Sequence, residues 1–318
     1  GTIRDMERRK RHARNRDAGR QPYRITENDL EIFRLLARYR YLRTSFIYGL
    51  LLHRSRQGLS RSLRRLFDHG YVNKPREQRR GYNDIYCPDI FELDAKGEQL
   101  LLDQDNRPLE ITRLYRQKTD APVKNFGHSM MICDVMASIE LGFQGTDYNL
   151  ITWQEIVART DYENPMKLPC SIRHTFPDGH SENHDTFIAP DGLFGIRRPN
   201  GQVSFFAVET ERFNPIEPTN LKRASFLKKI LAYRNIQQTG VYKTQLKIPN
   251  MRILVIAPTE TRMTHMIELT ERITQGSNLF LFANIPVQEE LMRALGPMPE
   301  LASQDWQRAI RNGTQLIT

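Results

Sequence analysis

Apolar residues recur at helical spacing in three short stretches of the N-terminal quarter. Thr26, followed by acidic residues, is a typical helix start, and the apolar positions after it predict a helix up to about residue 37. A second helix is expected from about residue 43 and a third over 59–69, with Gly70 suited to a left-handed C-cap. The third has an apolar face of Leu59, Leu63, Leu66 and Phe67, and its other faces carry Ser60, Arg61, Arg64 and Arg65.

The pattern then changes to that of a β-hairpin. Residues 71–74 are expected to form a strand, 75–84 the tip of the hairpin and 85–93 the return strand, before a closing helix over 95–102. Three helices, a hairpin and a fourth helix predict a winged helix-turn-helix domain over residues 21–102.

Positive charge is concentrated in the same part of the chain. Residues 1–80 hold 22 Lys and Arg against 8 Asp and Glu, whereas the remaining residues hold 25 against 29, although the whole chain carries +10. This distribution is typical of a surface that neutralises phosphates. Residues 1–20 are basic and aperiodic, which predicts a flexible arm whose Arg9 and Arg11 lie on a DNA backbone; a solvated basic tail is the alternative.

A winged helix of this charge is expected to bind double-stranded DNA. The helix over 59–69 would enter the major groove, and the arginines of the hairpin tip would contact the neighbouring backbone or minor groove. The residues predicted to contact DNA are Ser60, Arg61, Arg64, Arg65, Arg79 and Arg80. The alternative is a winged helix that binds proteins, but so many arginines on the expected face favour DNA.

Beyond a polar segment at 103–124, which is typical of a linker, residues 125–285 alternate between helical and strand patterns, and this predicts an α/β domain. Helices are expected over 126–141, 221–236 and 260–274, and strands or extended segments over 148–157, 181–188, 193–196, 203–211, 252–257 and 279–283. Residues 286–318 should add a short helix at 287–295 and a tail. A helix, three strands, a helix and a strand is the core order of restriction-endonuclease-like folds.

Acidic residues stand at the ends of two of these strands. Asp191 follows Pro190, and Glu209 comes 18 residues later in an apolar strand that continues to Glu211. Because strand side chains alternate, the two glutamates share one face and need a counter-charge, for which a divalent cation is the usual solution. Asp191, Glu209 and Glu211 are therefore expected to bind Mg²⁺ or Mn²⁺ through oxygen ligands. The alternative is a carboxylate pair held by Arg212 or Lys222.

This span resembles the PD-(D/E)xK nuclease motif, with Asp191 and Glu209 as its acids. Glu211 occupies the position of the motif's Lys, and in some members of that superfamily the Lys lies on the following helix. Lys228 or Lys229 would serve here, and Lys229 shares a helix face with Tyr233, so that both are expected to contact the scissile phosphate. Whether a tyrosine or a water attacks the phosphate is left open by the sequence.

Two further groups of polar residues lie in the same domain. In a strand, His180, Glu182 and His184 share one face, and we expect Glu182 and His184 to join the acids in catalysis; a polar loop after 177–179 is the alternative. On the first helix of the domain, His128 and Asp134 are six positions apart and share no face, so core or surface roles are favoured for them and for Glu140.

The order of these motifs is similar to that of the replication-relaxation family, which includes the MobC-type relaxases of plasmid mobilisation. The motifs are a winged helix, His-x-x-x-x-x-Asp on a helix, 182–185 (Glu-Asn-His-Asp), Pro-Asp and Glu-x-Glu, within about 25–260. Ser181 stands where the family has a His before the Glu. The resemblance implies nicking of supercoiled DNA at a transfer origin with a divalent metal, and other mobilisation or conjugation proteins as partners.

Composition narrows the class of protein further. The three cysteines of the 318 residues are far apart, which argues against a disulfide framework or a cysteine zinc site, and no apolar run is long enough to cross a membrane.

We therefore expect a cytoplasmic protein of mixed α+β or α/β class, a winged helix followed by a restriction-endonuclease-like (PD-(D/E)xK) domain. The expected function is metal-dependent DNA nicking, as a monomer or homodimer. The alternative is a non-catalytic DNA-binding regulator or assembly factor with a decayed nuclease fold.

Overall fold

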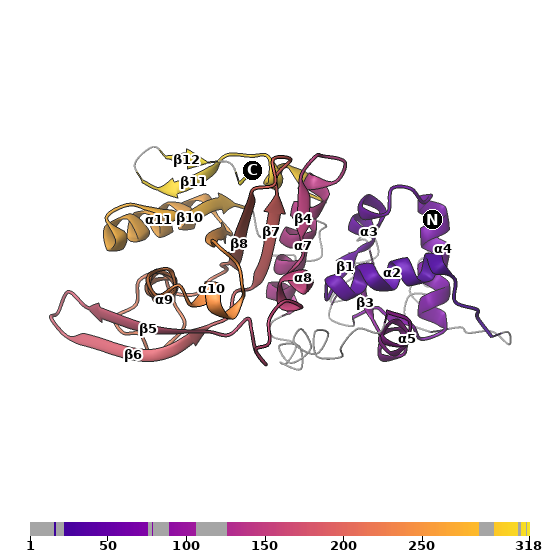
Figure 1. Ribbon diagram of the computed structural model, residues 1–318, viewed down its shortest axis with the longest axis horizontal. Helices are drawn as coiled ribbons and strands as arrows, with labels where there is room; N and C mark the ends of the chain where they lie inside the picture. The colour runs from indigo at the N-terminus through magenta and orange to yellow at the C-terminus, as the bar shows by residue number, and fades with distance from the viewer. Residues whose placement is uncertain are drawn as a thin grey trace, which may run out of the picture. The chain divides into compact units, whose positions relative to one another are not determined.

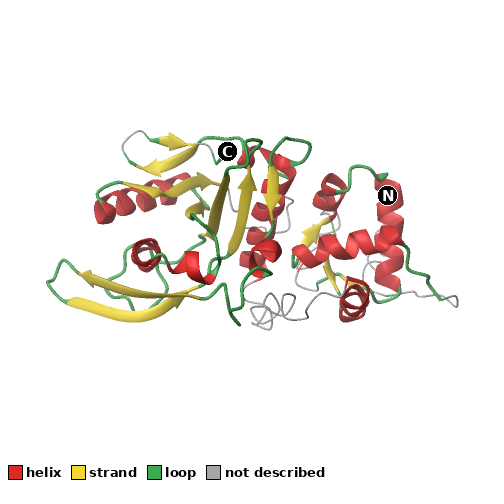
Figure 2. Ribbon diagram, viewed as in Figure 1, coloured by secondary structure: helices red, strands yellow, loops and turns green. Residues whose placement is uncertain are grey.

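The computed structural model describes residues 16, 22–75, 78, 89–105, 126–285, 296–310, 313–315 and 317–318. These residues form a mixed α and β structure with three sheets (Figures 1 and 2). The chain divides into two compact units, with the break after Gln144. Residues 296–299 return to the first unit, and residues 300–318 belong to the second. In the described segments, none of the helices combines the length and the apolar character that crossing a bilayer requires.

The first unit opens with the expected helices. Helix α2 (Glu27–Arg38) begins at Thr26, whose side chain accepts a hydrogen bond from the Asp29 amide while the Asp29 carboxylate accepts one from the Thr26 amide. This reciprocal capping satisfies two backbone donors that would otherwise lack partners. Helix α3 (Thr44–Leu50) follows, and both helices bury the apolar face that their spacing predicts.

Helix α4 (Arg56–Asp68) is the expected third helix, but it begins three residues earlier than predicted. Ser55 caps it by accepting a hydrogen bond from the Gly58 amide at 3.1 Å, so Gly58 lies in the first turn instead of before the helix. The predicted apolar face is buried, and Ser60, Arg61, Arg64 and Arg65 are exposed. The chain leaves the helix through Gly70, whose φ of +80° is the left-handed conformation that its position predicts.

A small antiparallel sheet accompanies these helices. Its order is β1 (Leu42–Arg43), β3 (Ile90–Leu93) and β2 (Val72–Asn73), and helix α5 (Ala95–Asp105) follows β3. The predicted hairpin tip, with Arg79 and Arg80, lies outside the described residues, as do Arg9 and Arg11 of the predicted arm. Arg16 of that arm has a defined place: its guanidinium donates to the Val72 carbonyl at 3.2 Å and to the Asp94 carboxylate at 2.9 Å.

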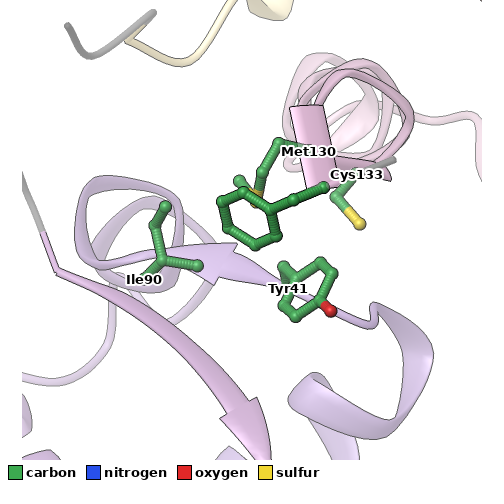
Figure 3. Packing of buried hydrophobic residues seen from close by; sticks show 5 residues of the cluster. Tyr41, Ile90, Met130 and Cys133 are labelled. Atoms are coloured by element: carbon green, nitrogen blue, oxygen red, sulfur yellow. The ribbon is translucent and has the colours of Figure 1, made fainter. Parts of the chain in front are cut away.

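Helix α7 (Phe126–Phe143) belongs to the first unit, whereas the sequence led us to place it at the start of the second domain. Its residues Met130 and Cys133 pack with Tyr41 and Ile90 in a buried cluster (Figure 3). The helix is apolar around most of its circumference, so its pattern does not indicate which neighbour it packs against.

The second unit is built on a seven-stranded sheet. The strand order is β12 (Thr314–Gln315), β11 (Trp306–Ala309), β10 (Ser277–Asn284), β9 (Arg252–Ala257), β8 (Val203–Thr210), β7 (Gly192–Arg197) and β4 (Asn149–Ile151). The neighbours β8, β9 and β10 are parallel, and the other neighbouring strands are antiparallel. The parallel strands are nearly continuous runs of buried apolar residues, as is usual for strands covered on both faces.

Helix α9 (Phe226–Thr239) lies between this sheet and a separate hairpin (Figure 1). Its Phe226 and Tyr233 rings contact the rings of Phe282 and Phe280 on β10. The hairpin consists of β5 (Leu168–Thr175) and β6 (Ser181–Ile188), and the amide of Ser171 on β5 donates to the Asn235 side chain of α9 at 2.9 Å. Short helices α8 (Trp153–Val157) and α10 (Val241–Gln245), helix α11 (Glu260–Thr274) and a 3-10 turn, η4 (Pro299–Ala302), complete the unit.

Strand β9 and helix α11 have the bounds that the sequence predicts, but two predictions in this unit are wrong and one strand is missed. The expected strand over 148–157 is a short strand followed by α8, because Thr152 and Glu155 form a capping box. The expected helix over 221–236 begins only at Phe226, because Ser225 caps it. Strand β5 was not predicted at all. The expected helix over 287–295 lies outside the described residues.

Candidate functional site

Two glutamates are buried at the end of β8. The strand lies between β7 and β9, with Glu209 in register with Val255, and the Glu211 amide donates to the Ile256 carbonyl at 2.8 Å. Only 2% of the Glu209 surface and none of the Glu211 surface is exposed. Two carboxylates without solvent are stable only if other groups compensate them.

Helix α9 supplies that compensation through Lys229 and Tyr233. The Lys229 Nζ donates to Glu209 Oε2 at 2.8 Å and also to Glu211 Oε1. The Tyr233 hydroxyl donates to the second oxygen of Glu209. Lys229 and Tyr233 are four residues apart on α9, so one helix face presents both groups to the end of β8. Each oxygen of Glu209 thus has a donor of its own.

Asp191 joins the glutamates from the neighbouring strand. It immediately precedes β7, and its Oδ2 accepts hydrogen bonds from the Thr210 amide at 2.9 Å and from the Thr210 hydroxyl at 3.3 Å. Thr210 lies between the two glutamates and points to the opposite side of the strand. Sequence reasoning missed Thr210, although its position between two acids at a strand end was a signal that it could have used.

The electrostatics of the cluster follow from burial and from the shared cation. Burial, reinforced by the Asp191 charge and opposed by Lys229 and Tyr233, raises the pKa of Glu209 to about 7. Burial alone would lower the pKa of Lys229, but the neighbouring carboxylates outweigh it and hold this pKa above its ordinary value. Burial and Glu209 raise the pKa of Tyr233 well above 10, so its hydroxyl remains a donor.

The oxygen atoms of the cluster decide whether a divalent cation would fit there. Glu211 Oε2 is buried and has no hydrogen-bond partner among the described residues, so one carboxylate oxygen is uncompensated. The described residues contain no group of three His, Cys, Asp or Glu arranged to bind a metal. Mg²⁺, however, usually takes one or two carboxylates and completes its shell with water and substrate phosphates. The acids of the cluster could serve only such an open site, in which Glu211 Oε2 is the oxygen without a partner, because both oxygens of Glu209 already accept hydrogen bonds from Lys229 and Tyr233.

The structure distinguishes the predicted cations. Lys229 contacts both glutamates, so neither Arg212 nor Lys222 is needed to hold the pair. Among the described residues, Lys228 forms no ion pair with the glutamates; burial raises the pKa of the Cys170 thiol on β5, and the Lys228 charge opposes this. Tyr233 is 1% exposed, which differs from the phosphate contact that its spacing suggested: its hydroxyl is inside the protein and bonded to Glu209.

The predicted cluster on β6 has different partners from the acids of β8. As its alternation predicts, Glu182 and His184 lie on one face of β6, where the His184 Nε2 and Glu182 Oε1 atoms are 3.0 Å apart. Glu182 also accepts a hydrogen bond from the Leu221 amide at 3.2 Å, in the segment before α9. In the described structure these contacts tie the hairpin to that segment, and none of them joins Glu182 or His184 to Glu209.

The polar residues of α7 have structural partners in the first unit. Asp134 forms a two-pronged ion pair with Arg43, with Nε–Oδ1 at 3.0 Å and Nη2–Oδ2 at 3.1 Å, and both side chains are buried. Glu140 accepts hydrogen bonds from Arg38 and from the Tyr39 hydroxyl. These contacts agree with the core and surface roles favoured for these residues from the sequence.

Comparison with known proteins identifies the family. A family model described as replication-relaxation matches residues 33–250, which is more than half of the chain. The chain belongs to the replication-relaxation family. No match was found among curated proteins or among solved structures.

The part of the chain that matches the replication-relaxation family includes both groups of candidate residues. It takes in the exposed arginines of α4 and also Asp191, Glu209, Glu211 and Lys229. This membership confirms the family resemblance read from the order of motifs in the sequence. It indicates a role in replication or in the processing of mobile-element DNA.

Proposed function

We propose that this protein is a metal-dependent DNA-nicking enzyme of a mobile genetic element, a relaxase that acts at a transfer or replication origin. The observation that carries the proposal is the contact of Lys229 with both Glu209 and Glu211 at the end of β8, with Asp191 hydrogen-bonded to Thr210 between them. An Asp and a Glu at neighbouring strand ends, with a Lys from the following helix, make up the residue set of those PD-(D/E)xK nuclease sites in which the Lys lies on that helix. The second unit would then be a restriction-endonuclease-like domain.

Each residue of the site has a chemical role in this proposal. Asp191 and Glu209 would hold Mg²⁺ or Mn²⁺, which when bound supplies an activated water and stabilises charge on the phosphodiester. Lys229 would lie against the scissile phosphate, because its ammonium remains charged beside the carboxylates. Glu211, with its uncompensated oxygen, would be the third acid of the cluster. Tyr233 would orient Glu209 through its hydroxyl and is too buried to attack DNA.

The first unit would bind double-stranded DNA as a winged helix. Three helices, a small antiparallel sheet and a further helix support this assignment. The exposed side chains of α4 that would face the major groove are Ser60, Arg61, Arg64 and Arg65. Because these arginines stand opposite a buried apolar face, the helix can present them without losing its packing. Mobilisation or conjugation proteins and a second copy of the chain are the further partners proposed.

A second candidate is a DNA-binding regulator or assembly factor that does not cut. The observation in its favour is that Lys229 already supplies the counter-charge for which a metal was expected. The two candidates differ in one measurable property, the nicking of DNA.

The test is nicking of a supercoiled plasmid that carries the cognate element, with Mg²⁺ or Mn²⁺. Wild type, Asp191→Ala and Glu268→Ala are compared, since Glu268 is an exposed acid on α11. We expect metal-dependent nicking by wild type and Glu268→Ala and none by Asp191→Ala. If wild type shifts the plasmid DNA but does not nick it with either metal, the regulator is the better description.

A further inference from the structure

An exposed aromatic ring follows the buried acids directly. Phe213 is 66% exposed, yet it stands two residues after Glu211, which has no exposed surface. Two residues of extended chain span roughly 7 Å at most, so the ring is attached to the backbone close to the acids. Burying a phenylalanine side chain would be worth about 1.5–3 kcal/mol, which this chain forgoes at this position.

The backbone that carries the ring is held on both sides. Before it, the Glu211 amide donates to the Ile256 carbonyl at 2.8 Å. After it, the Asn214 carbonyl accepts from the Arg262 guanidinium at 2.6 Å, and the Pro215 carbonyl accepts from the Phe226 amide at 2.9 Å. The ring is therefore presented from a fixed position, which reduces the entropy lost when a ligand packs on it.

Cations lie along the same loop. From residue 212 to 225, before α9, the chain has three Lys and Arg and one acid, Glu217, which is itself paired with Arg272 at 2.6 Å. The Arg212 guanidinium lies 5.8 Å from the centre of the Phe213 ring, and Lys222 and Arg223 are exposed further along the loop. An exposed ring among cations is the arrangement by which proteins bind single-stranded nucleic acid: the cations take the phosphates and the ring takes the face of a base.

A base within a duplex cannot use such a ring, because its two faces are stacked on its neighbours. Only a base that is unpaired or turned out of the helix has a free face. We propose that Phe213 stacks on an unpaired base beside the acid cluster, so that the second unit takes a single-stranded or locally melted DNA segment. This inference rests on the proposed function, since it names the form of DNA that the same site receives.

The test measures binding without any metal or cleavage. A short fluorescent oligothymidylate is titrated with the full chain in EDTA, for wild type, Phe213→Ala and Phe187→Ala. Phe187 is a matched control, because it is 56% exposed and has Lys167 over its ring at 4.4 Å, but it lies on β6. Removal of the stacking ring should weaken binding roughly 5- to 150-fold in Phe213→Ala, which corresponds to about 1–3 kcal/mol. Phe187→Ala should bind like wild type.

A second variant reports stacking directly. The natural tryptophans, Trp153 and Trp306, are buried, so a Phe213→Trp variant adds an exposed fluorophore. Its added fluorescence should be quenched by oligothymidylate, and its affinity should match or exceed that of wild type.

Three results would overturn the inference: equal affinities of the two alanine variants, no quenching in Phe213→Trp, or a change in self-association of Phe213→Ala with unchanged affinity for the oligonucleotide. None of them would decide the proposed function, because plasmid nicking by wild type and its loss in Asp191→Ala are measured independently.

Discussion

At the scale of single residues, the acid cluster depends on one ammonium group. Lys229 lies between two carboxylates that have almost no contact with solvent, whereas its own side chain is 20% exposed. Removing one partner of a buried ion pair is far more costly than removing an exposed charge, because the remaining charges stay unpaired in a medium of low dielectric constant.

Lys229→Met should therefore destabilise the second unit strongly. The variant keeps most of the side-chain volume but leaves Glu209 and Glu211 without their cation, and the expected loss is about 3–5 kcal/mol in the free energy of unfolding. Urea denaturation followed by circular dichroism measures it. Lys222→Met, at an exposed lysine on the loop before α9, should change stability by less than about 0.5 kcal/mol. Similar losses in the two variants would mean that Lys229 does not stabilise the acids.

Arg43 and Asp134 form a second buried ion pair, in the first unit. Burial raises the pKa of Asp134 and the Arg43 charge opposes it, so the carboxylate is costly without its partner. We expect Arg43→Met and Asp134→Asn each to cost about 3–5 kcal/mol, and the double variant to cost much less than their sum, because it leaves no unpaired charge. A double-mutant cycle by urea denaturation checks this; additive losses would contradict it.

At the scale of elements, α4 is the helix that we propose enters a DNA groove. Its arginines lie on the exposed side of the helix, and its opposite, apolar face is buried. Phosphate contacts make binding weaken as salt rises, with a slope of about −0.9 per phosphate neutralised on logarithmic axes.

An Arg61→Ala and Arg64→Ala double variant should bind duplex DNA more weakly and with a shallower salt dependence. The slope should fall by roughly 1 for each phosphate that the variant no longer neutralises. The control is Arg159→Ala with Arg197→Ala, which removes the same charge from exposed positions of the second unit. Fluorescence anisotropy over a range of salt concentrations gives both slopes, and equal slopes for the two double variants would exclude α4 as the DNA-contacting helix.

Elements with a strong local signal could be predicted from the sequence, and elements decided by tertiary contacts could not. Strand β9 is an apolar run and α11 has a capping Thr259, so their bounds could be read directly. Helix α8 depends on the capping box of Thr152 within a segment that otherwise suits a strand. Strand β5 alternates between buried and exposed residues, but Pro169 interrupts the usual strand signal.

The candidate site shows the same division. Because strand side chains alternate, the two glutamates at the end of β8 are expected on one face of the strand. A Lys and a Tyr four positions apart are likewise expected on one face of a helix. Which cation reaches the acids depends on how α9 packs on the sheet, and no local pattern distinguishes Lys229 from Lys228 or Arg212. The burial of Tyr233 depends on packing against Phe280, which lies far along the chain.

At the scale of the whole molecule, the residues proposed to bind duplex DNA and those proposed to cut it belong to different units. Binding and cutting should therefore be separable by mutation. The Arg61→Ala and Arg64→Ala double variant should lose affinity for DNA and nothing else, so its plasmid nicking in Mg²⁺ at low salt should recover as protein concentration rises. Asp191→Ala should shift duplex DNA as wild type does, yet it should not nick at any concentration, because no excess of bound protein replaces a missing metal ligand.

Gel-shift titrations measure the affinity for duplex DNA, and single-turnover nicking of the same plasmid measures the rate of cutting. If Asp191→Ala lost duplex affinity as severely as the arginine variant, the acids would belong to the duplex-binding surface. Binding and cutting would then not be assigned to separate units. If the arginine variant remained inactive at saturating protein, α4 would contribute to the cutting step itself. Recovery in one variant and none in the other requires two sites with different tasks, one that holds DNA by charge and one that acts on a phosphodiester.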